Sequence, residues 1–549
     1  MVMKNKFDLF FSRREFFLPL ILFALFLAAS LPGITWGAPA LWNPDELVWR
    51  VDMALNGAMQ FDVTEPDYNY PSLPKQVMYL IGSITYGLGR SSFAFIVAAR
   101  SFSSILGAVV AVLVYRIARL IGANKRISLL AGLLYIVSGV AAANGRFAHN
   151  DLYLQSFSVL CLYSVIRFQY SQKTIWLLVS FLSVGMAASS KYTGASLVLL
   201  PVGVIVLMNW KTLLHNWLVW FGVLMAGGIL VILGYGIGTP RILIAPVEYL
   251  SKAVPAAIRF STYGFGSGTP TGLYGQWAVF HEAVGGFAYY LFLAAFAWFV
   301  VCLIAHRLGR LAVEEARIPG LLILLINIII FDLPFLVSIN YIPRHFIPFV
   351  PVFAVLAAFF VDDILRFASD LKLGFPQKIV FFSLTVGITY SALRLASISL
   401  LFMNDARIPA SDYIDGIRGY GKSIEYTLYP PIVDKKRFMR AHNYPIYFVK
   451  YEDDSVPTGG RIKYNQGEEG LLERRTDYFV IDSYTYGRFY SDSECAINAV
   501  ECDFFKRLLA GETTSYHLVA DFSYRLPKYL PQLTIASVNP DIKIYELTP

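Results

Sequence analysis

The sequence FFLPLILFALFLAASLPGITWGAPALWNPDELVWR, residues 16–50, joins a long apolar run to two adjacent carboxylates, Asp45 and Glu46. A helix needs about 20 apolar residues to cross the hydrocarbon of a bilayer, and this run approaches that length. A secretory signal peptide has a shorter apolar region, so we expect an uncleaved first membrane helix. The two acids then follow it directly, at one face of the membrane.

The rest of the chain supports a membrane location. Of its 549 residues, 56% are hydrophobic and 15% are charged, and the mean hydropathy is +0.54. These values lie outside the range of soluble domains and predict a polytopic α-helical membrane protein with about eleven transmembrane helices. The predicted spans are residues 16–34, 96–120, 127–143, 151–168, 174–189, 193–209, 217–236, 286–305, 319–340, 346–365 and 377–401.

The basic residues predict the orientation. Lysine and arginine gather in alternate loops, and the intervening short loops hold only Arg146, Lys191 and Arg344. Because positive loops stay on the cytoplasmic side, the N-terminus is predicted to be cytoplasmic and the C-terminus extracytoplasmic, in a plasma, inner or equivalent membrane. The net charge of +8 is explained by these loops, so no nucleic-acid partner is expected.

Two domains are expected. Residues 1–401 form the transmembrane domain, in which outer loop 35–95 carries the acidic motif and outer loop 237–285 is rich in glycine. That second loop is interpreted either as a lid, with Tyr263, Tyr274 and Trp277 covering a sugar, or as an ordinary interfacial loop. Residues 402–549 lack long apolar runs and predict a small extracytoplasmic α/β domain.

In this C-terminal domain, DYFVIDSY, YHLVADFSY and IKIYEL predict strands, and AINAVECDFFKRLLAG predicts a helix that ends at a glycine. Cys495 and Cys502 lie seven residues apart, which is about 10 Å along a continuous helix and too far for a disulfide. A bridge requires the helix to begin after Cys495, so the pairing stays open. Cys161 and Cys302 lie in apolar spans and are expected to pack.

The acidic pair has a purely structural alternative. Asn43 fits a helix N-cap, Pro44 fits the first helical position, and Glu46 lies three residues after the cap, as in a capping box. Capping accounts for Glu46 but does not require Asp45. A second acidic cluster, His149, Asn150 and Asp151 in NGRFAHNDLYLQSF, has the same alternative, since Asn150 or Asp151 can cap the fourth span.

The exceptional outer cations also have two interpretations. Arg146, Lys191 and Arg344, with His345 beside it, either satisfy helix-end carbonyls and snorkel, or bind an anion. Because they share a predicted membrane face with the acids, an anionic lipid headgroup explains the whole set. Arginine suits phosphate through its planar fork, and lysine suits it as a point charge.

These groups indicate transfer of a sugar from a lipid-linked phosphate. Asp45 would accept the proton of an attacking hydroxyl, while Lys191 and Arg344 stabilise the departing phosphate, and a single displacement would invert the anomeric carbon. The alternatives are a lipid-linked-sugar flippase or polytopic transporter, for which Asp332 is the best candidate residue, and a non-catalytic receptor. A transporter should carry charges near the middle of the membrane and paired halves, which the sequence does not show.

Several motifs resemble one family in order and membrane side: NPDE after the first span, YPSLPKQVMYLIG, GRFAHNDLYLQSF, SKYTGASLVLLPV, YIPRHFIPFVPVFAVLAAFFVDDI and NDARIPASDYI. The chain resembles GT-C superfamily glycosyltransferases, in the branch of protein O-mannosyltransferases and lipid A aminoarabinose transferases. The resemblance covers about residues 1–420 well. Where family members carry a His-Pro pair, this chain has Tyr70, Pro71 and Ser72, and it lacks the WWDYG-like motif of oligosaccharyltransferases.

The resemblance implies a polyprenyl-phosphate sugar donor, a catalytic acid at Asp45, a second functional acid at Asp151, and phosphate contacts near Lys191 and Arg344. The acceptor can be a protein, a lipid or a glycan. We add Glu46 to the catalytic candidates, and Arg146 and His345 to the phosphate-binding ones. The predicted donor and acceptor pocket contains Tyr70, Lys75, His149, Asn150, Tyr263 and Tyr341. A divalent cation could bind Asp45, Glu46, Asp151 and His149, but we expect no obligatory metal or other cofactor.

Overall fold

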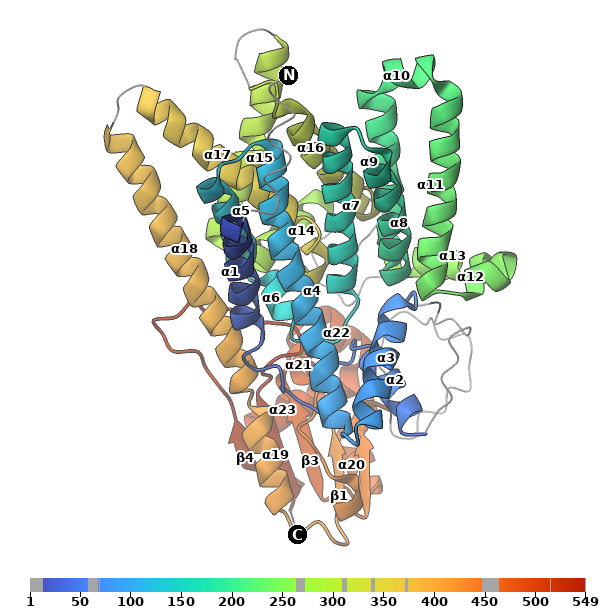
Figure 1. The fold of residues 1–549 in the computed structure, drawn as a ribbon. Coiled ribbons are helices and arrows are strands. Elements are labelled where there is room, and N and C mark those ends of the chain that lie inside the picture. The colour runs from blue at the N-terminus through green and yellow to red at the C-terminus, as the bar shows by residue number, and fades with distance from the viewer. Residues whose placement is uncertain are drawn as a thin grey trace. The chain divides into compact units, whose positions relative to one another are not determined.

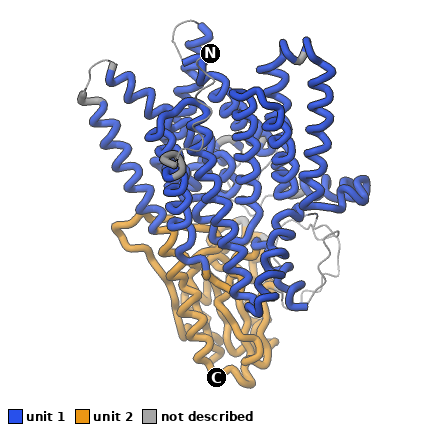
Figure 2. Tube along the Cα trace, in the orientation of Figure 1, with its two compact units in different colours: residues 1–34, 45–262, 270–396 blue, residues 35–44, 263–269, 397–549 orange. Residues whose placement is uncertain are grey.

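The computed structural model describes residues 13–57, 68, 70–262, 272–308, 314–336, 341–370, 374–446, 464–513 and 515–548. The chain is mostly helical, at 71%, with a small sheet near its C-terminus. Its described residues form two compact units (Figure 2): residues 13–34, 45–262 and 272–396 belong to the first, and residues 35–44 and 397–548 belong to the second. The predicted site residues from Asp45 to Arg344 that are described all belong to the first unit.

The first unit is a bundle of helices (Figure 1). Its main helices are α1 (Arg13–Ser30), α4 (Ser92–Ile121), α5 (Lys125–Val137), α6 (Val140–Asn144), α7 (Asp151–Ser171), α8 (Thr174–Ser190), α9 (Leu199–Gly203), α11 (Trp217–Gly238), α15 (Gly286–Arg307), α16 (Ile318–Asp332), α17 (Val350–Asp370) and α18 (Gly374–Met403). Most of each of the eleven predicted spans is helical, so the apolar runs located the helices of this unit well.

Five helices in the described part are long and apolar enough to cross a membrane, and three shorter apolar helices accompany them. Two predicted spans are interrupted. Residues 127–143 break at Gly139, whose φ of 83° is left-handed, and residues 193–209 divide into the 3₁₀ segment η3 (Tyr192–Val198), α9 and a π-helical turn, Val204–Met208. The membrane character is therefore confirmed, whereas the number of eleven spans stays a prediction.

Helix α8 packs between α7 and α11. Its approach to α11 depends on two glycines: a Cβ on Gly185 would lie 2.2 Å from the Val231 carbonyl oxygen, and one on Gly234 would lie 2.5 Å from the Leu182 carbonyl oxygen. Small residues let membrane helices approach backbone to backbone in this way. Helix α7 is buried on nearly all sides, which places its first residue, Asp151, inside the bundle end.

The two long loops predicted for the outer face contain helices. Loop 35–95 carries α2 (Val48–Leu55) and α3 (Leu73–Gly87), and segment 237–285 carries α12 (Arg241–Ile244), α13 (Pro246–Thr262) and α14 (Gly272–Val284). The described part of 237–285 is therefore largely helical, and its place as an outer loop stays a prediction. Helical periodicity in α13, whose exposed apolar residues recur at Val247, Leu250, Val254 and Ile258, was the overlooked signal. Tyr263 lies outside the described residues, so its role as part of a lid stays a prediction.

The second unit contains a five-stranded sheet in the order β2-β1-β3-β5-β4. Strands β1 (Ser423–Tyr426), β2 (Arg440–Asn443) and β3 (Tyr478–Asp482) are parallel, and β5 (Ile542–Leu547) runs antiparallel between β3 and β4 (Tyr516–Phe522). Helices α19 (Arg407–Gly416), α20 (Gly467–Glu473), α21 (Ser483–Tyr486), α22 (Asp492–Ile497) and α23 (Ala499–Ala510) complete the unit. The small α/β domain and strands β3, β4 and β5 were predicted; β1 and β2, of four residues each, were missed.

The open question of the outer cysteines is resolved. Cys495 and Cys502 form a disulfide with their Cα atoms 5.1 Å apart. The helix is not continuous, because Asn498, with φ of −124° and ψ of 59°, separates α22 from α23. Because the chain turns at this break, the two cysteines come closer together than they would in a straight helix. Helix α23 ends at Gly511 in the left-handed conformation, as expected.

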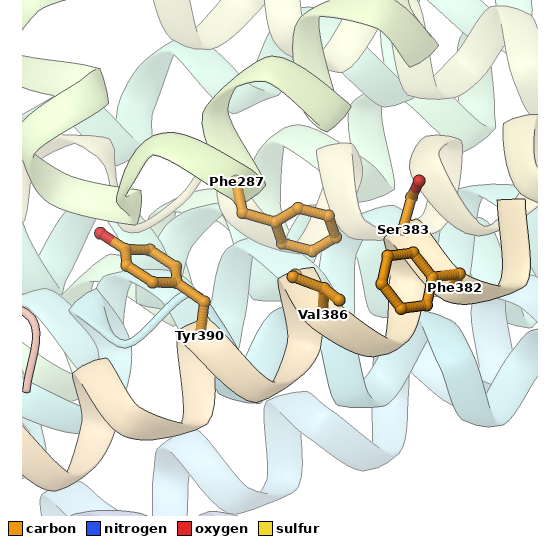
Figure 3. Close-up of a pocket in the computed structure, with 6 residues that line it drawn as sticks. Phe287, Phe382, Ser383, Val386 and Tyr390 are labelled. Carbon is orange, nitrogen blue, oxygen red and sulfur yellow. The ribbon is translucent and has the colours of Figure 1, made fainter. Parts of the chain in front are cut away.

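An apolar hollow of about 400 Å³ lies between α15 and α18 (Figure 3). Its walls are Phe287, Phe382, Ser383, Val386, Gly387 and Tyr390. None of the predicted site residues lines it, and its walls offer few polar groups. The hollow therefore does not enter the chemistry below.

Candidate active site

The acidic pair does not cap a helix. Helix α2 begins at Val48, its N-cap is Leu47, and no side chain caps it. The capping alternative for Glu46 was therefore wrong. Likewise Asn150 makes no cap bond to α7; its side-chain amide instead donates to the Ser190 carbonyl at 3.1 Å.

Glu46 is held by a buried arginine. Arg100 of α4 donates its Nε to Glu46 Oε2 at 3.0 Å and its NH2 to Glu46 Oε1 at 2.7 Å, and both side chains are fully buried. The Ala148 amide donates to the same carboxylate at 2.9 Å, and the Leu47 amide donates to the Ala148 carbonyl at 3.0 Å. Glu46 thus fastens segment 45–47 to the segment before α7.

This geometry changes the role of Glu46. The sequence analysis made it a catalytic candidate, but its oxygens are buried and bound by Arg100 and the Ala148 amide. This geometry favours a role in positioning its neighbour, Asp45. Arg100 was missed by the sequence analysis. Its signal was a charge inside the apolar run FIVAARSFSSILG, since ionisable residues within membrane helices are costly and require a partner.

Replacing Glu46 with glutamine is expected to destabilise the protein strongly, because it leaves the buried Arg100 charge without its partner. Breaking one side of a buried ion pair costs about 3–5 kcal/mol. Thermal unfolding of purified protein in nanodiscs measures the change. The control is Glu248→Gln, which removes an exposed carboxylate from its pair with Arg241 and should leave the transition unchanged. Equal transitions for wild type and Glu46→Gln would refute this positioning role.

Four predicted residues converge at one end of the helical bundle. Arg344, in the short 3₁₀ segment η6 (Pro343–Phe346), donates its NH2 to Asp45 Oδ2 at 2.6 Å, and its Nε lies 3.8 Å from Asp151 Oδ2. Lys191, directly after α8, donates to Asp151 Oδ1 at 2.8 Å. Residues distant in sequence therefore build one chain of alternating charge, from Asp45 through Arg344 and Asp151 to Lys191.

His149 extends this chain. Its Nδ1 lies 2.8 Å from Asp151 Oδ2, which assigns the Nδ1 proton to a bond with that carboxylate. Its Nε2 is buried and has no hydrogen-bond partner among the residues that the structure describes. The ring of Tyr70 meets the His149 ring edge to face at 5.8 Å. With its proton on Nδ1, the ring keeps the lone pair of Nε2.

Exposure separates the two aspartates. The Asp45 side chain is 46% exposed, whereas that of Asp151 is 3% exposed. The side chains of Arg344 and Lys191 are 20% and 18% exposed. Asp45 is therefore the carboxylate that a substrate can reach, and Asp151 is the anchor that holds the cations.

The protonation states at neutral pH follow from the surroundings. Burial alone would raise the pKa of Asp45, but the charge of Arg344 and the hydrogen bond from it lower that pKa below its usual value. Burial lowers the pKa of His149 despite the neighbouring Asp151 carboxylate. Burial would lower the pKa of Arg344, yet Asp151 and Asp45 raise it. Asp45 is thus a carboxylate, Arg344 a cation and His149 a neutral ring.

Arg146 has a structural environment. Its guanidinium donates to the carbonyl oxygens of Pro32, Ala142 and Ala29 at 2.7, 2.8 and 2.8 Å, and its side chain is fully buried. It satisfies the carbonyls at the ends of α1 and α6, as the alternative interpretation proposed. Its predicted role in binding phosphate is contradicted by this geometry.

The other predicted pocket residues divide into two sets. Lys75 is buried with its ammonium 3.4 Å from the Tyr70 carbonyl, so it supports the segment beside His149. Tyr341 is buried against the Phe335 ring and donates to the Phe335 carbonyl at 3.2 Å, so it belongs to the core and not to the pocket. His345 has its ring against Phe335 as well. Tyr274 is 78% exposed and Trp277 is 42% exposed.

One residue beside the site was missed. Tyr192 follows Lys191, donates its hydroxyl to the Tyr68 carbonyl at 3.0 Å, and lies 3.5 Å from the Tyr249 hydroxyl of α13. It ties Tyr68 to the end of α8. A tyrosine directly after a lysine in SSKYTG carried no distinctive sequence signal.

The sequence analysis named four residues that could together bind a divalent cation. Within the described ranges, no three His, Cys, Asp or Glu side chains are grouped as metal ligands. Glu46, one of the four proposed ligands, is bound to Arg100, and a guanidinium stands between the carboxylates of Asp45 and Asp151. The residues thus do not form the proposed four-ligand set.

The family comparison matches part of the chain. Residues 72–234 match the family model described as Dolichyl-phosphate-mannose-protein mannosyltransferase. This stretch contains Lys75, His149, Asp151 and Lys191. No curated protein matches the sequence.

The structural comparison covers nearly the whole chain. The structure of ArnT from Cupriavidus metallidurans bound to undecaprenyl phosphate is 14% identical, with a TM-score of 0.50 over 96% of this chain and 97% of that one. The chain has the GT-C fold. The Pmt1-Pmt2 complex of S. cerevisiae bound to the sugar donor is 19% identical over 44% of this chain and 34% of that chain, with a TM-score of 0.31.

Over residues 72–234 the chain is thus similar to the mannosyltransferase family, and over nearly its whole length it has the fold of ArnT. The resemblance found in the sequence motifs is thereby confirmed. The five long apolar helices of the described part support an integral membrane protein, as the composition predicted.

Proposed function

We propose that this chain moves a sugar from a polyprenyl-phosphate-linked donor to an acceptor hydroxyl, with inversion of the anomeric carbon. The observation that carries this proposal is the convergence of Asp45, Arg344, Asp151 and Lys191. The site offers one exposed carboxylate next to two cations, at the end of helices that suit a bilayer. A base for a hydroxyl and a receptor for a phosphodiester are the two elements that such a transfer needs.

The reaction follows from these positions. The acceptor hydroxyl attacks the anomeric carbon from the face opposite the phosphate, and its proton passes to an Asp45 carboxylate oxygen. As the new carbon–oxygen bond forms, the bond between the anomeric carbon and the phosphate oxygen breaks, and its electron pair leaves with polyprenyl phosphate. Arg344 and Lys191 donate hydrogen bonds to the oxygens that gain this charge.

Asp151 keeps the cations in place before the donor arrives. Arg344 and Lys191 are balanced by the carboxylates of Asp45 and Asp151, so the charged groups form a closed set. A donor phosphate adds one negative charge and competes with Asp45 for Arg344. We infer that donor binding partly releases Asp45 from its ion pair, which makes the carboxylate a stronger base only when the donor is present.

Two features support a lipid-linked donor. The family description names dolichyl-phosphate-mannose, and the ArnT structure with the similar fold contains undecaprenyl phosphate. We therefore propose a polyprenyl-phosphate hexose or pentose as the donor, acting at the predicted extracytoplasmic face, with a protein, lipid or glycan hydroxyl as the acceptor. Nothing favours the flippase or transporter alternative: Asp332, its best candidate, ends α16 and does not lie at the middle of that helix.

The test compares cells with and without this chain. Intact-mass analysis of lipids and exported proteins should reveal one sugar that is present only with the chain, and membranes supplied with the matching polyprenyl-phosphate sugar should restore it. Addition of EDTA should leave the rate unchanged, as expected without an obligatory metal. Identical lipid, protein and glycan masses in the two cell lines would refute the proposed function.

A further inference from the structure

The segment that leads into Asp45 is held by residues near the start of the C-terminal domain. Residues 35–44 belong to the same compact unit as residues 397–548, although Asp45 itself belongs to the helical unit (Figure 2). Two of these residues, Trp36 and Trp42, are buried at 3% and 6% exposure. Large side chains in a connecting segment are buried only where other residues pack against them.

Arg407 provides that contact. Its guanidinium carbon lies 4.3 Å from the centre of the Trp42 ring and 5.1 Å from the centre of the Trp36 ring. The two indoles meet edge to face at 5.6 Å. A guanidinium over desolvated indoles is a favourable cation–π arrangement.

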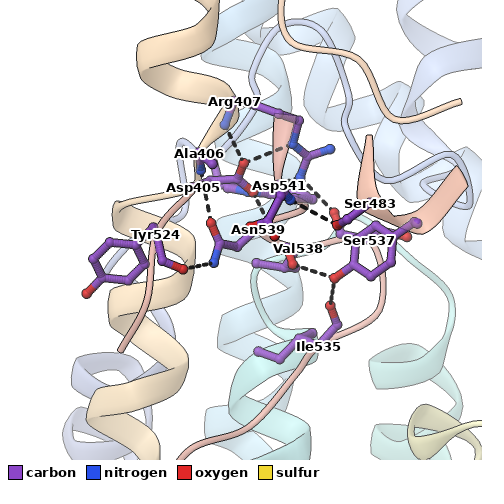
Figure 4. A network of polar contacts seen from close by, with 12 residues as sticks. Asp405, Ala406, Arg407, Ser483, Tyr524, Ile535, Ser537, Val538, Asn539 and Asp541 are labelled. Atoms are coloured by element: carbon purple, nitrogen blue, oxygen red, sulfur yellow. Dashed lines mark hydrogen bonds and ion pairs between the residues drawn. The ribbon is translucent and has the colours of Figure 1, made fainter. Parts of the chain in front are cut away.

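Asp405 fixes Arg407 and one indole together. Its carboxylate accepts five N–H groups: Trp36 Nε1 at 2.8 Å, the Arg407 amide, Nε and NH2 at 2.9, 2.9 and 2.7 Å, and the Asn539 amide at 2.6 Å. Both Asp405 and Arg407 are fully buried. Arg407 also donates to the Ser537 carbonyl at 2.7 Å, and the Asn539 side chain joins the Ala406 amide to the Tyr524 carbonyl (Figure 4).

The backbone of the segment is shaped for this contact. Gly37 has a φ of 60°, and a Cβ on it would lie 2.6 Å from the Trp42 ring. Only glycine fits this position without displacing the indole. The local sequence of 35–44 is therefore adapted to the Trp36–Trp42 pair.

The residues that flank the segment are held by a single residue of the helical unit. Arg100 NH1 donates to the Ile34 carbonyl at 2.9 Å, and the same guanidinium binds Glu46. Segment 35–44 itself is fastened within its own unit by Arg407 and Asp405. Trp42 is three residues before Asp45, a span of about 10 Å at most.

We propose that Asp405 and Arg407 are positioning residues for the base Asp45, acting through Trp36 and Trp42. The inference rests on the proposed function only in naming what Asp45 does. Loss of the clamp, defined as Asp405, Arg407, Trp36 and Trp42, frees segment 35–44 and lets Asp45 leave the geometry in which it meets the acceptor. Small displacements of a reacting group lower the rate of catalysis without abolishing substrate binding.

The test uses two matched arginines. Arg407→Lys removes the planar fork and the stacking area but keeps the charge. The control is Arg474→Lys, because Arg474 also makes a two-point pair with a buried carboxylate of the same domain, Glu425, at 2.8 and 3.0 Å. We expect Arg407→Lys to lower kcat about tenfold to a hundredfold with little change in the KM for the donor. Arg474→Lys should leave kcat unchanged. Trp36→Phe keeps an aromatic ring and loses only the indole N–H hydrogen bond, so it should retain more activity than Trp36→Ala.

A second readout is independent of activity. The Leu47 amide is bonded to Ala148, so hydrogen exchange of peptides that cover 40–50 reports whether the segment is held. Exchange should be faster in Arg407→Lys and unchanged in Arg474→Lys. Equal exchange and equal kcat in the two variants would overturn the clamp. Absence of transfer by the wild type would refute the proposed function, and the exchange result would still decide the clamp.

Discussion

Asp45→Asn is expected to lower kcat by about 10²–10⁴-fold, the range that a positioned general base contributes. Asparagine keeps the size of the side chain but cannot accept the hydroxyl proton. The donor KM should not rise, because Arg344 and Lys191 remain and Asp45 no longer competes for Arg344. Transfer of labelled sugar from a polyprenyl-phosphate donor in proteoliposomes measures both quantities.

The matched control is Asp521→Asn. Asp521 is also 46% exposed and is paired with a lysine, Lys543, but it lies in strand β4 of the second unit. Its loss should leave transfer unchanged. Near-normal turnover in Asp45→Asn would refute the assignment of the base, whatever the outcome at other positions.

Removal of the Arg344 charge is the second large effect. Arg344→Gln should lower kcat/KM for the donor by about 10²–10³-fold, as expected for the loss of one group that stabilises developing charge. Arg344→Lys should recover part of this loss, since lysine keeps the charge without the planar fork. The affinity for the product, measured as inhibition by polyprenyl phosphate, should fall in parallel.

The control for Arg344 is Arg241→Gln, which removes a cation from an exposed pair with Glu248. It should alter neither the rate nor the inhibition. If Arg344→Gln were inhibited by polyprenyl phosphate as strongly as the wild type, Arg344 would not bind the donor phosphate.

The sequence located the candidate reactive residues better than the residues that hold them in place. Four residues stood out because they carry charge in predicted outer loops that otherwise hold few charged residues: Asp45, Asp151, Lys191 and Arg344. That signal is local to each residue and does not depend on the fold. Their membrane face was inferred from the loops, and the structure brings them to one end of the bundle.

The supporting residues depend on distant contacts. The capping pattern around Asn43 predicted a helix from Pro44, but Arg100 and Ala148 draw Glu46 away and the helix starts at Val48. Likewise, nothing in segment 35–44 indicates that its tryptophans contact Arg407, far along the chain. Contacts between residues far apart in the chain override the local tendency to form a helix, and a motif of a few residues cannot predict them.

The central claim is that one site holds a prenyl phosphate beside the Asp45 carboxylate. The most direct measurement is an experimental structure of the chain bound to polyprenyl phosphate in a lipid nanodisc. The account predicts phosphate oxygens within hydrogen-bond distance of Arg344 and Lys191, with the Asp45 carboxylate facing the space where the anomeric carbon would lie. A phosphate bound elsewhere, with Arg344 still closed on Asp45 and Lys191 on Asp151, would contradict it.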